Sequence, residues 1–347
     1  MGIKVLVVDD SALMRKYIRE MLESDSEIEV IAVARDGEDA VNKAKKYEPD
    51  VITLDVNMPK MDGITALRIL VKEEIAPVIM LSSLTQEDAD ITLQALEIGA
   101  FDCIAKPGGT ISLNIKIIKD ELIKKVKEAA KKGVIKRIKQ KKVIEKFDIK
   151  NKIIDKKKAV AIGISTGGPK TLLEVIPYLP EDLPASVFIV QHMPPAFTNS
   201  FARRLDEISK IKVVEAKSGL RVKPSLGVLG KGGYHLKVYK NALGNIVVRT
   251  PSFPEHLFKP SADIMMESVL SVYGENTIGV LMTGMGDDGA DAMVKIKKAG
   301  GITIAESEET AIVFGMPKAA IERGGADFVA PSYKIAEYIV KAVYEEL

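Results

Sequence analysis

The sequence predicts two doubly wound α/β domains, the first built on a five-stranded parallel sheet and the second on a mostly parallel sheet. The length of 347 residues suits two domains better than one. Hydrophobic residues make up 46% and charged residues 28%, so the chain can fill folded cores. Short apolar runs alternate with segments of helical spacing, a pattern typical of parallel strands joined by right-handed crossover helices.

Charge divides the chain into three blocks. The net charge is −9 over residues 1–115, +12 over 116–158 and −1 over 159–347, within a total of +2. This division predicts a first domain at 1–120, a basic, partly helical linker at 121–158 and a second domain at 159–347. Lysines in the linker could bind nucleic acid or an anionic membrane, but we favour a solvated linker, and whether it docks or stays mobile is open.

Three absences narrow the class of protein. No run of about 18 apolar residues occurs, so we expect no membrane insertion. The first residues, MGIKVLVVDD, lack the basic and long apolar regions of a secretory signal. The single cysteine, Cys103, rules out an internal disulfide framework and argues against a cysteine-rich metal site. Together these absences predict a cytoplasmic protein.

The first block reads as five strand–helix units. Continuous apolar runs, expected for strands buried on both faces of a sheet, lie at 3–8, 28–33, 51–55, 77–82 and 102–105. Helical spacing follows these runs at 13–22, 37–47, 63–73, 87–98 and 111–131. Gly133 is expected to end the last helix. In folds of this kind, ligands bind beyond the carboxyl ends of the strands.

Five polar side chains stand at those carboxyl ends: Asp9, Asp10, Asp55, Ser82 and Lys106. Three carboxylates in one crevice repel each other unless a cation joins them, and oxygen ligands suit Mg²⁺. A carboxylate can also act as a nucleophile that forms an acyl phosphate. A lysine and a hydroxyl would then hold the remaining phosphoryl oxygens. Capping of the following helix explains one such aspartate, but not all five positions.

The segments VVDDS, LDVNMPKMDG and AKPG, in this order and spacing, resemble the response-regulator receiver domain over about residues 1–120. The resemblance implies that a partner histidine kinase phosphorylates Asp55. It also implies an Mg²⁺ site formed by Asp9, Asp10, Asp55 and the backbone carbonyl group of Asn57.

The same resemblance assigns roles to two further residues. Ser82 matches the switch serine or threonine of the family, and Lys106 matches the lysine that contacts the phosphoryl group. The bond between Lys106 and Pro107 is expected to be cis, because cis peptides are almost confined to bonds that precede proline.

The second block opens with a predicted buried strand at 159–164 and a helix at 169–178. Between them, Gly163-Ile-Ser-Thr-Gly167 fits the G-x-S-x-G pattern of a strand–turn–helix nucleophile elbow, from which Ser165 would protrude. Glycine-rich turns between a strand and a helix also bind phosphates. This segment alone therefore leaves a nucleophile and a phosphate loop equally open.

A serine nucleophile requires a base, and the chain has only His192, His235 and His256 to offer. His192 follows a predicted strand at 186–191, which should bring it to the same edge of the sheet as Ser165. His235 lies in a segment that alternates like a strand, and His256 lies in a proline-flanked loop. The position at a strand end favours His192.

An orienting carboxylate should come from a third strand end. The segment TIGVLMTGMGDDGADAM supplies a strand, a glycine-rich turn, and Asp287 and Asp288 at the start of a helix over 288–299. One of these aspartates could cap that helix. The other could orient His192.

The order Ser…His…Asp differs from the order in α/β-hydrolases, which disfavours that family. The segments GISTGGP, VQHMP and LMTGMGDDGA instead resemble the catalytic domain of the chemotaxis protein-glutamate methylesterases, the CheB family, over about residues 159–347. The resemblance implies that Ser165 is the nucleophile, His192 the general base and acid, and Asp288 the orienting carboxylate.

Backbone N–H groups at Thr166 and in the Met285–Gly286 turn could form an oxyanion hole. By the resemblance, Thr166 lies beside the nucleophile and Met285 matches the oxyanion-hole donor. The implied reactions are hydrolysis of glutamate methyl esters on the cytoplasmic helices of chemoreceptors, which releases methanol, and deamidation of specific receptor glutamines. The esterase chemistry would need no cofactor, since one triad serves both acyl transfers.

The two blocks together predict an enzyme of chemotaxis adaptation that phosphorylation regulates. In the family, a CheA-type histidine kinase phosphorylates the receiver, which otherwise covers the esterase site. Our hypothesis is that phosphorylation of Asp55 reorders the region of Ser82 and weakens receiver packing over Ser165.

Two other functional classes deserve comparison. A DNA-binding regulator is disfavoured, because the second block is near neutral, rich in strands and without an evident helix-turn-helix. A nucleotide-binding module is disfavoured, because the loop at 163–168 lacks the G-x-x-x-x-G-K-[S/T] pattern. We therefore expect no nucleic acid among the partners.

Overall fold

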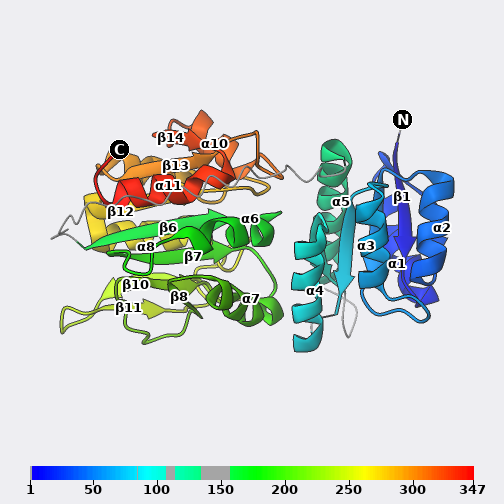
Figure 1. Cartoon of the computed structure of the whole chain (residues 1–347), viewed down its shortest axis with the longest axis horizontal. Helices are drawn as coiled ribbons and strands as arrows, with labels where there is room; N and C mark the ends of the chain where they lie inside the picture. The colour runs from blue at the N-terminus through cyan, green and yellow to red at the C-terminus, as the bar shows by residue number, and fades with distance from the viewer. Residues whose placement is uncertain (1, 84, 107–113, 134–156) are drawn as a thin grey trace. The chain divides into compact units, whose positions relative to one another are not determined.

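The computed structural model describes residues 2–83, 85–106, 114–133 and 157–347 (Figure 1). Contacts between residues divide the chain into two units, Met1–Ile138 and Lys139–Leu347. Each unit contains one large sheet flanked by helices, which confirms the predicted α/β class. The predicted cis bond before Pro107 and most of the predicted linker lie outside the described residues.

The first unit is a five-stranded sheet with the strand order β2-β1-β3-β4-β5, in which every neighbouring pair is parallel. Its elements are β1 (Ile3–Val8), α1 (Ala12–Glu23), β2 (Ile28–Ala34), α2 (Gly37–Tyr47), β3 (Val51–Asp55), α3 (Gly63–Lys72), β4 (Val78–Ser82), α4 (Gln86–Ile98), β5 (Asp102–Ala105) and α5 (Asn114–Lys132). All five predicted strands form, because their apolar runs are buried between helices on both faces of the sheet.

Local sequence fixes the turns that follow the strands of the first unit. Ser11, Asp36 and Asp62 cap α1, α2 and α3, each accepting a hydrogen bond from a backbone N–H group in the first turn. A Cβ atom on Gly63 would lie 1.9 Å from the carbonyl oxygen of Asp55. Only glycine therefore allows α3 to begin so close to the end of β3, which explains the glycine that closes LDVNMPKMDG.

The second unit contains a seven-stranded sheet of order β14-β13-β12-β6-β7-β9-β8, with parallel neighbours, and a separate antiparallel pair, β10 and β11. Its strands are β6 (Lys158–Ile164), β7 (Ala185–Gln191), β8 (Lys212–Glu215), β9 (Leu226–Leu229), β10 (Lys237–Lys240), β11 (Ile246–Arg249), β12 (Thr277–Leu281), β13 (Ile302–Glu306) and β14 (Phe328–Ala330). Its α-helices are α6 (Gly168–Val175), α7 (Pro195–Ile208), α8 (Ala262–Tyr273), α9 (Ala290–Lys298), α10 (Met316–Glu322) and α11 (Ser332–Val343).

Helices cover both faces of the seven-stranded sheet. Ala159 and Ala161 of β6 share a buried cluster with apolar side chains of α8, α9 and α10. Val160 and Ile162 alternate with them and point to the opposite face, and both are fully buried. On that side of the fold α11 packs against α6. None of the helices among the described residues is long and apolar enough to cross a bilayer.

Strand order places three polar segments at one edge of this sheet. β6 lies between β12 and β7, and all three strands run parallel. The backbone N–H of Ser165, just past β6, donates to the carbonyl oxygen of Thr283, which follows β12. The backbone N–H of His192, just past β7, donates to the carbonyl oxygen of Ile164. The carboxyl ends of the three strands are thus tied together, as expected for a ligand-binding edge.

Candidate functional site

The turn between β6 and α6 presents Ser165. Gly167 caps α6 with a φ of +75°, a conformation that favours glycine. The N–H of Gly168 donates to the carbonyl oxygen of Ser165 over 2.8 Å and closes the turn. A Cβ atom on Gly163 would lie 2.8 Å from side chains of Ala262 and Leu281, so this glycine lets α8 approach β6. Steric constraints therefore explain why both positions of the G-x-S-x-G pattern carry glycine.

His192 is held by contacts on two sides of its ring. Its Nε2 atom lies 2.8 Å from a carboxylate oxygen of Asp288. The ring of Phe258 stacks on it, with a centroid distance of 4.2 Å and an angle of 7° between the planes. Among the described residues, the buried Nδ1 atom has no hydrogen-bond partner. Since Nε2 donates to the carboxylate, Nδ1 carries the lone pair that can accept a proton.

Asp288 is a buried carboxylate at the amino end of α8. It accepts hydrogen bonds from the hydroxyl of Ser261 at 2.7 Å and from the backbone N–H groups of Ala262 at 2.6 Å and Asp263 at 3.1 Å. Burial by itself would raise the pKa of Asp288. The bond from His192 and these backbone donors outweigh burial and lower the pKa to about 2. The carboxylate is therefore ionised at neutral pH and fixes the tautomer of the imidazole.

Neither of the paired aspartates caps α9 as the sequence suggested. Gly289 precedes the helix, and no side chain caps it locally. The backbone N–H of Ala292 instead donates to Asp263 of α8 over 2.7 Å. Helices α8 and α9 thus exchange caps, each amino end being held by an aspartate from the other segment. Asp287 is exposed and pairs with Arg323.

Two backbone N–H groups beside Ser165 suit an oxyanion hole. Within the described part of the chain, the N–H groups of Thr166 and Met285 have no hydrogen-bond partner. A Cβ atom on Gly284 would lie 2.8 Å from the Cβ atom of Ser165, which places the Met285 turn directly against Ser165. Free donors beside a nucleophile can stabilise the negative oxygen of a tetrahedral intermediate.

Side chains that sequence reasoning missed hold these turns in place. The amide nitrogen of Gln191 donates to the carbonyl oxygens of Ser165 at 2.9 Å and His192 at 3.0 Å. The hydroxyl of Thr283 donates to the carbonyl oxygen of Thr166, and the backbone N–H of Thr283 donates to the buried carboxylate of Glu306. The sequence feature that could have identified Gln191 is its position at the end of β7, one residue before His192.

The other two histidines differ in burial and in hydrogen bonding. His235 is fully buried, donates through Nε2 to the carbonyl oxygen of Pro254 at 2.8 Å and accepts from the N–H of Ser261 at 3.3 Å. Burial lowers the pKa of His235, so its ring is neutral at pH 7. His256 is exposed, and its ring centroid lies 6.4 Å from that of Phe258. Both nitrogens of His235 are occupied, which leaves it a structural part of the site.

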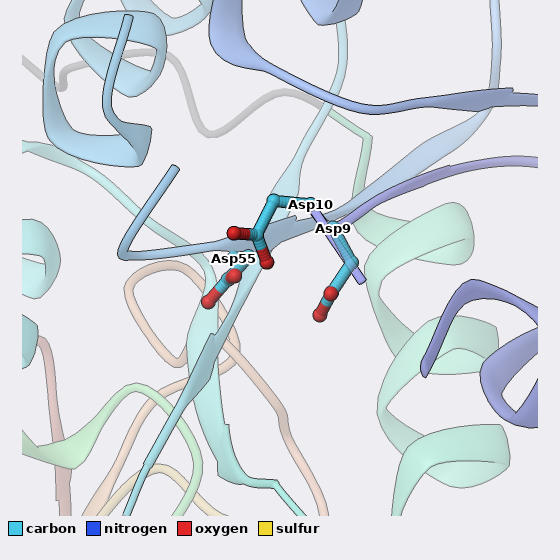
Figure 2. Close-up of side chains that lie close together, drawn as sticks. All are labelled: Asp9, Asp10 and Asp55. Carbon is cyan, nitrogen blue, oxygen red and sulfur yellow. The ribbon is translucent and has the colours of Figure 1, made fainter. Parts of the chain in front are cut away.

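A second site lies at the carboxyl ends of β1 and β3 in the first unit. Asp9, Asp10 and Asp55 each offer an oxygen, and these atoms lie within 4.8 Å of one another (Figure 2). Asp9 and Asp55 are buried, whereas Asp10 is exposed. The Lys106 ammonium, which follows β5, lies 2.6 Å from Asp55 and 2.8 Å from Asp9. Four of the five predicted strand-end residues therefore meet in one crevice.

The donor set of this crevice fits Mg²⁺. Three carboxylates within reach of one ion are hard oxygen ligands, and a single ammonium does not balance their charge. Asp9, Asp10 and Asp55 would hold the ion, which would neutralise charge on an incoming phosphoryl group. The backbone N–H of Asn57 donates to the Asp55 carboxylate. The carbonyl group of Asn57 is the further ligand that the resemblance to receiver domains implies.

Ser82, the fifth residue, is fully buried at the end of β4. Its hydroxyl accepts a hydrogen bond from the Thr92 hydroxyl of α4 at 2.8 Å and donates to the carbonyl oxygen of Ser83 at 3.2 Å. The hydroxyl is thus bonded to α4 and to its own loop. A rotation of the Ser82 side chain toward Asp55 would break its bond to Thr92. Because Thr92 belongs to α4, such a rotation would couple the crevice to that helix.

We expect Asp55→Asn to stabilise the first unit at neutral pH. Burial raises the pKa of Asp55 from 3.8 to about 6, against the opposing effect of Lys106. The folded-state pKa exceeds the unfolded one, so ionisation of Asp55 removes stability as the pH rises from about 4 through about 6. Relative to the wild type, the variant should gain on the order of 1–2 kcal/mol at pH 7 and almost nothing at pH 4.

Calorimetric unfolding of the full chain without Mg²⁺ would measure this difference. Saturating Mg²⁺ should remove most of it, because a bound cation favours the ionised carboxylate. A variant that melts below the wild type at pH 7 without Mg²⁺ would contradict the expectation.

Two family models match the sequence. The CheB methylesterase model covers residues 160–339, and the response regulator receiver domain model covers residues 5–118. The chain is 55% identical over 350 residues to the protein-glutamate methylesterase/protein-glutamine glutaminase 3 of Syntrophomonas wolfei, with 98% of this chain and 99% of that protein aligned.

A second curated protein and a solved structure show the same similarity. The chain is 51% identical to the protein-glutamate methylesterase/protein-glutamine glutaminase of Caldanaerobacter subterraneus, over 99% of this chain and 97% of that protein. The crystal structure of the Thermotoga maritima CheB methylesterase catalytic domain superposes with a TM-score of 0.52 at 43% identity. That comparison covers 53% of this chain and 97% of the Thermotoga chain.

Proposed function

The chain belongs to the CheB methylesterase family and carries a response regulator receiver domain, and on this premise we propose that it demethylates glutamate methyl esters on chemoreceptors under the control of phosphorylation. It is a hydrolase of chemotaxis adaptation. The observation that carries the proposal is the bond between His192 and the ionised Asp288 beside a strand–turn–helix serine.

Hydrolysis begins when Ser165 attacks the ester carbonyl carbon while His192 Nδ1 accepts the hydroxyl proton. Asp288 stabilises the imidazolium that forms. The N–H groups of Thr166 and Met285 bind the negative oxygen of the tetrahedral intermediate. His192 then returns the proton to the departing methoxide, which leaves as methanol. A water molecule repeats the sequence on the acyl-enzyme and releases the glutamate carboxylate.

The same residues can deamidate glutamine. The carboxamide presents the same carbonyl carbon to Ser165, and His192 gives its proton to the departing nitrogen, which leaves as ammonia. Deacylation by water again yields glutamate. The name of the relatives, methylesterase and glutaminase in one protein, supports this second activity. The three triad side chains and two backbone donors suffice, so we propose that the esterase needs no cofactor.

The acidic crevice is proposed as the control site. A CheA-type histidine kinase is the proposed phosphodonor, and the Asp55 carboxylate is the acceptor. Lys106 holds a phosphoryl oxygen, and Ser82 leaves Thr92 to bind another. Because Thr92 belongs to α4, this movement would change the surface of the receiver. We propose that phosphorylation relieves inhibition of the esterase by the receiver.

The substrates indicate where the reaction takes place. By the resemblance, the chemoreceptor helices that carry the methyl esters lie on the cytoplasmic side of the membrane. We therefore propose a cytoplasmic enzyme that binds proteins, without nucleic acid as a partner and without insertion into the membrane.

Methanol release tests this function directly. The full chain, incubated with membranes that contain methylated chemoreceptors, should release methanol, and unmethylated receptors should give none. Acetyl phosphate with Mg²⁺ should raise the rate by at least about 5-fold, and Asp55→Asn should remove that stimulation. Absence of methanol would refute the esterase assignment, whereas an unstimulated but measurable rate would refute only the regulation.

A further inference from the structure

The loop of residues 251–260, called here the Phe253 loop, exposes two large apolar side chains. Phe253 is 75% exposed and Leu257 is 78% exposed. Most phenylalanine and leucine side chains of this unit are buried in its cores. Two exposed apolar side chains four residues apart form a patch only if the loop holds them in place.

Hydrogen bonds from Gly233 and the buried His235 hold the backbone of the Phe253 loop in place. The N–H of the buried His235 donates to the carbonyl oxygen of Pro251, and its Nε2 donates to that of Pro254, both over 2.8 Å. The N–H of Gly233 donates to the carbonyl oxygen of Lys259 at 2.9 Å. The two apolar side chains are therefore presented by an anchored backbone, so a partner that binds them need not order the loop first.

The same loop is continuous with the catalytic site. Phe258 stacks on His192 at 4.2 Å, one residue after the exposed Leu257. Ser261, directly after the loop, donates to Asp288 at 2.7 Å. A partner that rests on Phe253 and Leu257 is therefore held beside the base and the acid of the triad.

Charged groups flank this patch: Glu255 of the loop pairs with Lys259 at 2.8 Å, and the turn bonded to the loop carries Lys231. Lys231, in the exposed turn that Gly233 joins to the loop, lies with its ammonium 5.4 Å from the ring centroid of Tyr234. Tyr234 is 41% exposed and adds a third aromatic or apolar surface. A helix that carries glutamates next to its methyl ester would meet this ammonium. Apolar anchors beside a cation match an amphipathic acidic helix.

We propose that Phe253 and Leu257 dock the helix of the substrate protein and hold its ester side chain over Ser165. The inference rests on the proposed function and names the surface that selects the substrate. Methanol is too small a leaving group for the site to recognise, so selection must come from the rest of the substrate. An apolar stripe of the receptor helix covers the patch, and its acidic side faces Lys231.

Two substrates separate docking from catalysis. Phe253→Ala/Leu257→Ala in the full chain should raise KM for methylated receptor membranes by about 10- to 50-fold, because a few anchor side chains carry most of the binding energy of an interface. Hydrolysis of p-nitrophenyl acetate, which makes no use of the patch, should stay within about 2-fold of the wild type. Leu243→Ala is the matched control, since Leu243 is 84% exposed in the turn between β10 and β11.

Each outcome decides something different. Equal loss on both substrates would show that the loop serves only the triad, and an unchanged KM would show that the patch is not used; either overturns the inference. If the unphosphorylated double variant hydrolyses the small ester as fast as the phosphorylated wild type, its own receiver is the occupant, and the inference also fails. Absence of methanol with the wild type would instead sink the proposed function.

Discussion

Ser165→Ala should lower the rate of methanol release from methylated receptors by about 10⁴- to 10⁶-fold, the largest effect expected of any single replacement here. Alanine leaves the turn intact, because Gly163 and Gly167 still provide its geometry. The acyl-enzyme can no longer form, so only the backbone donors and substrate binding assist attack by water. Residual activity of that origin should remain above the uncatalysed rate.

The measurement is methanol release by the full chain activated with acetyl phosphate and Mg²⁺. Ser186→Ala is a suitable control, because Ser186 lies on β7 of the same sheet, where its hydroxyl is bonded to the carbonyl oxygen of Lys223 and to the Tyr273 hydroxyl. It should keep activity within about 2-fold. Activity of Ser165→Ala near that of the wild type would rule out the serine as nucleophile.

Asp288→Asn should lower kcat by about 10⁴-fold. An amide in this position cannot stabilise the imidazolium as an ionised carboxylate does, and its NH₂ group would favour the wrong tautomer of His192. The folded-state pKa of about 2 lies below the ordinary 3.8, so the stability that Asp288 contributes is present above pH 4 and is lost as the pH falls through about 2. At pH 7 the variant should therefore also lose on the order of 2 kcal/mol.

Asp287→Asn provides the matched control for this variant. The two residues are neighbours and undergo the same change, but Asp287 is exposed and pairs with Arg323. Activity and thermal unfolding of both variants would separate the chemical effect from the structural one. A rate for Asp288→Asn within 10-fold of the wild type, in a fully folded sample, would remove Asp288 from the triad.

The strands and their carboxyl ends were predictable because they depend on local pattern. Continuous apolar runs can only be buried between helices, so they gave β1 and β6 within a residue. Parallel strands then bring their ends together without further information, which explains how Asp9, Asp55 and Lys106 were placed in one crevice. The roles of the residues at those ends came instead from the resemblance to known families.

Contacts between segments far apart in the sequence were not predictable. The expected helix over 288–299 begins at Ala290, because Gly289 adopts a φ of +97°. One of Asp287 and Asp288 was expected to cap that helix, but the backbone partners of Asp288 lie at the start of α8, some 26 positions away. The stacking of Phe258 on His192 depends on a loop whose course no periodicity reveals. Such pairings arise from packing, which a pattern of residue types does not encode.

The exchange of caps between α8 and α9 has a consequence for newly made or partly opened chains. The first N–H groups of α8 hold the Asp288 carboxylate, and the Asp263 carboxylate accepts from the first turn of α9. A chain in which these helices have separated still contains Ser165, His192 and an ionised Asp288, but Asp288 is no longer held toward His192. The docking of α8 on α9 is therefore expected to be required for the histidine–carboxylate pair to form.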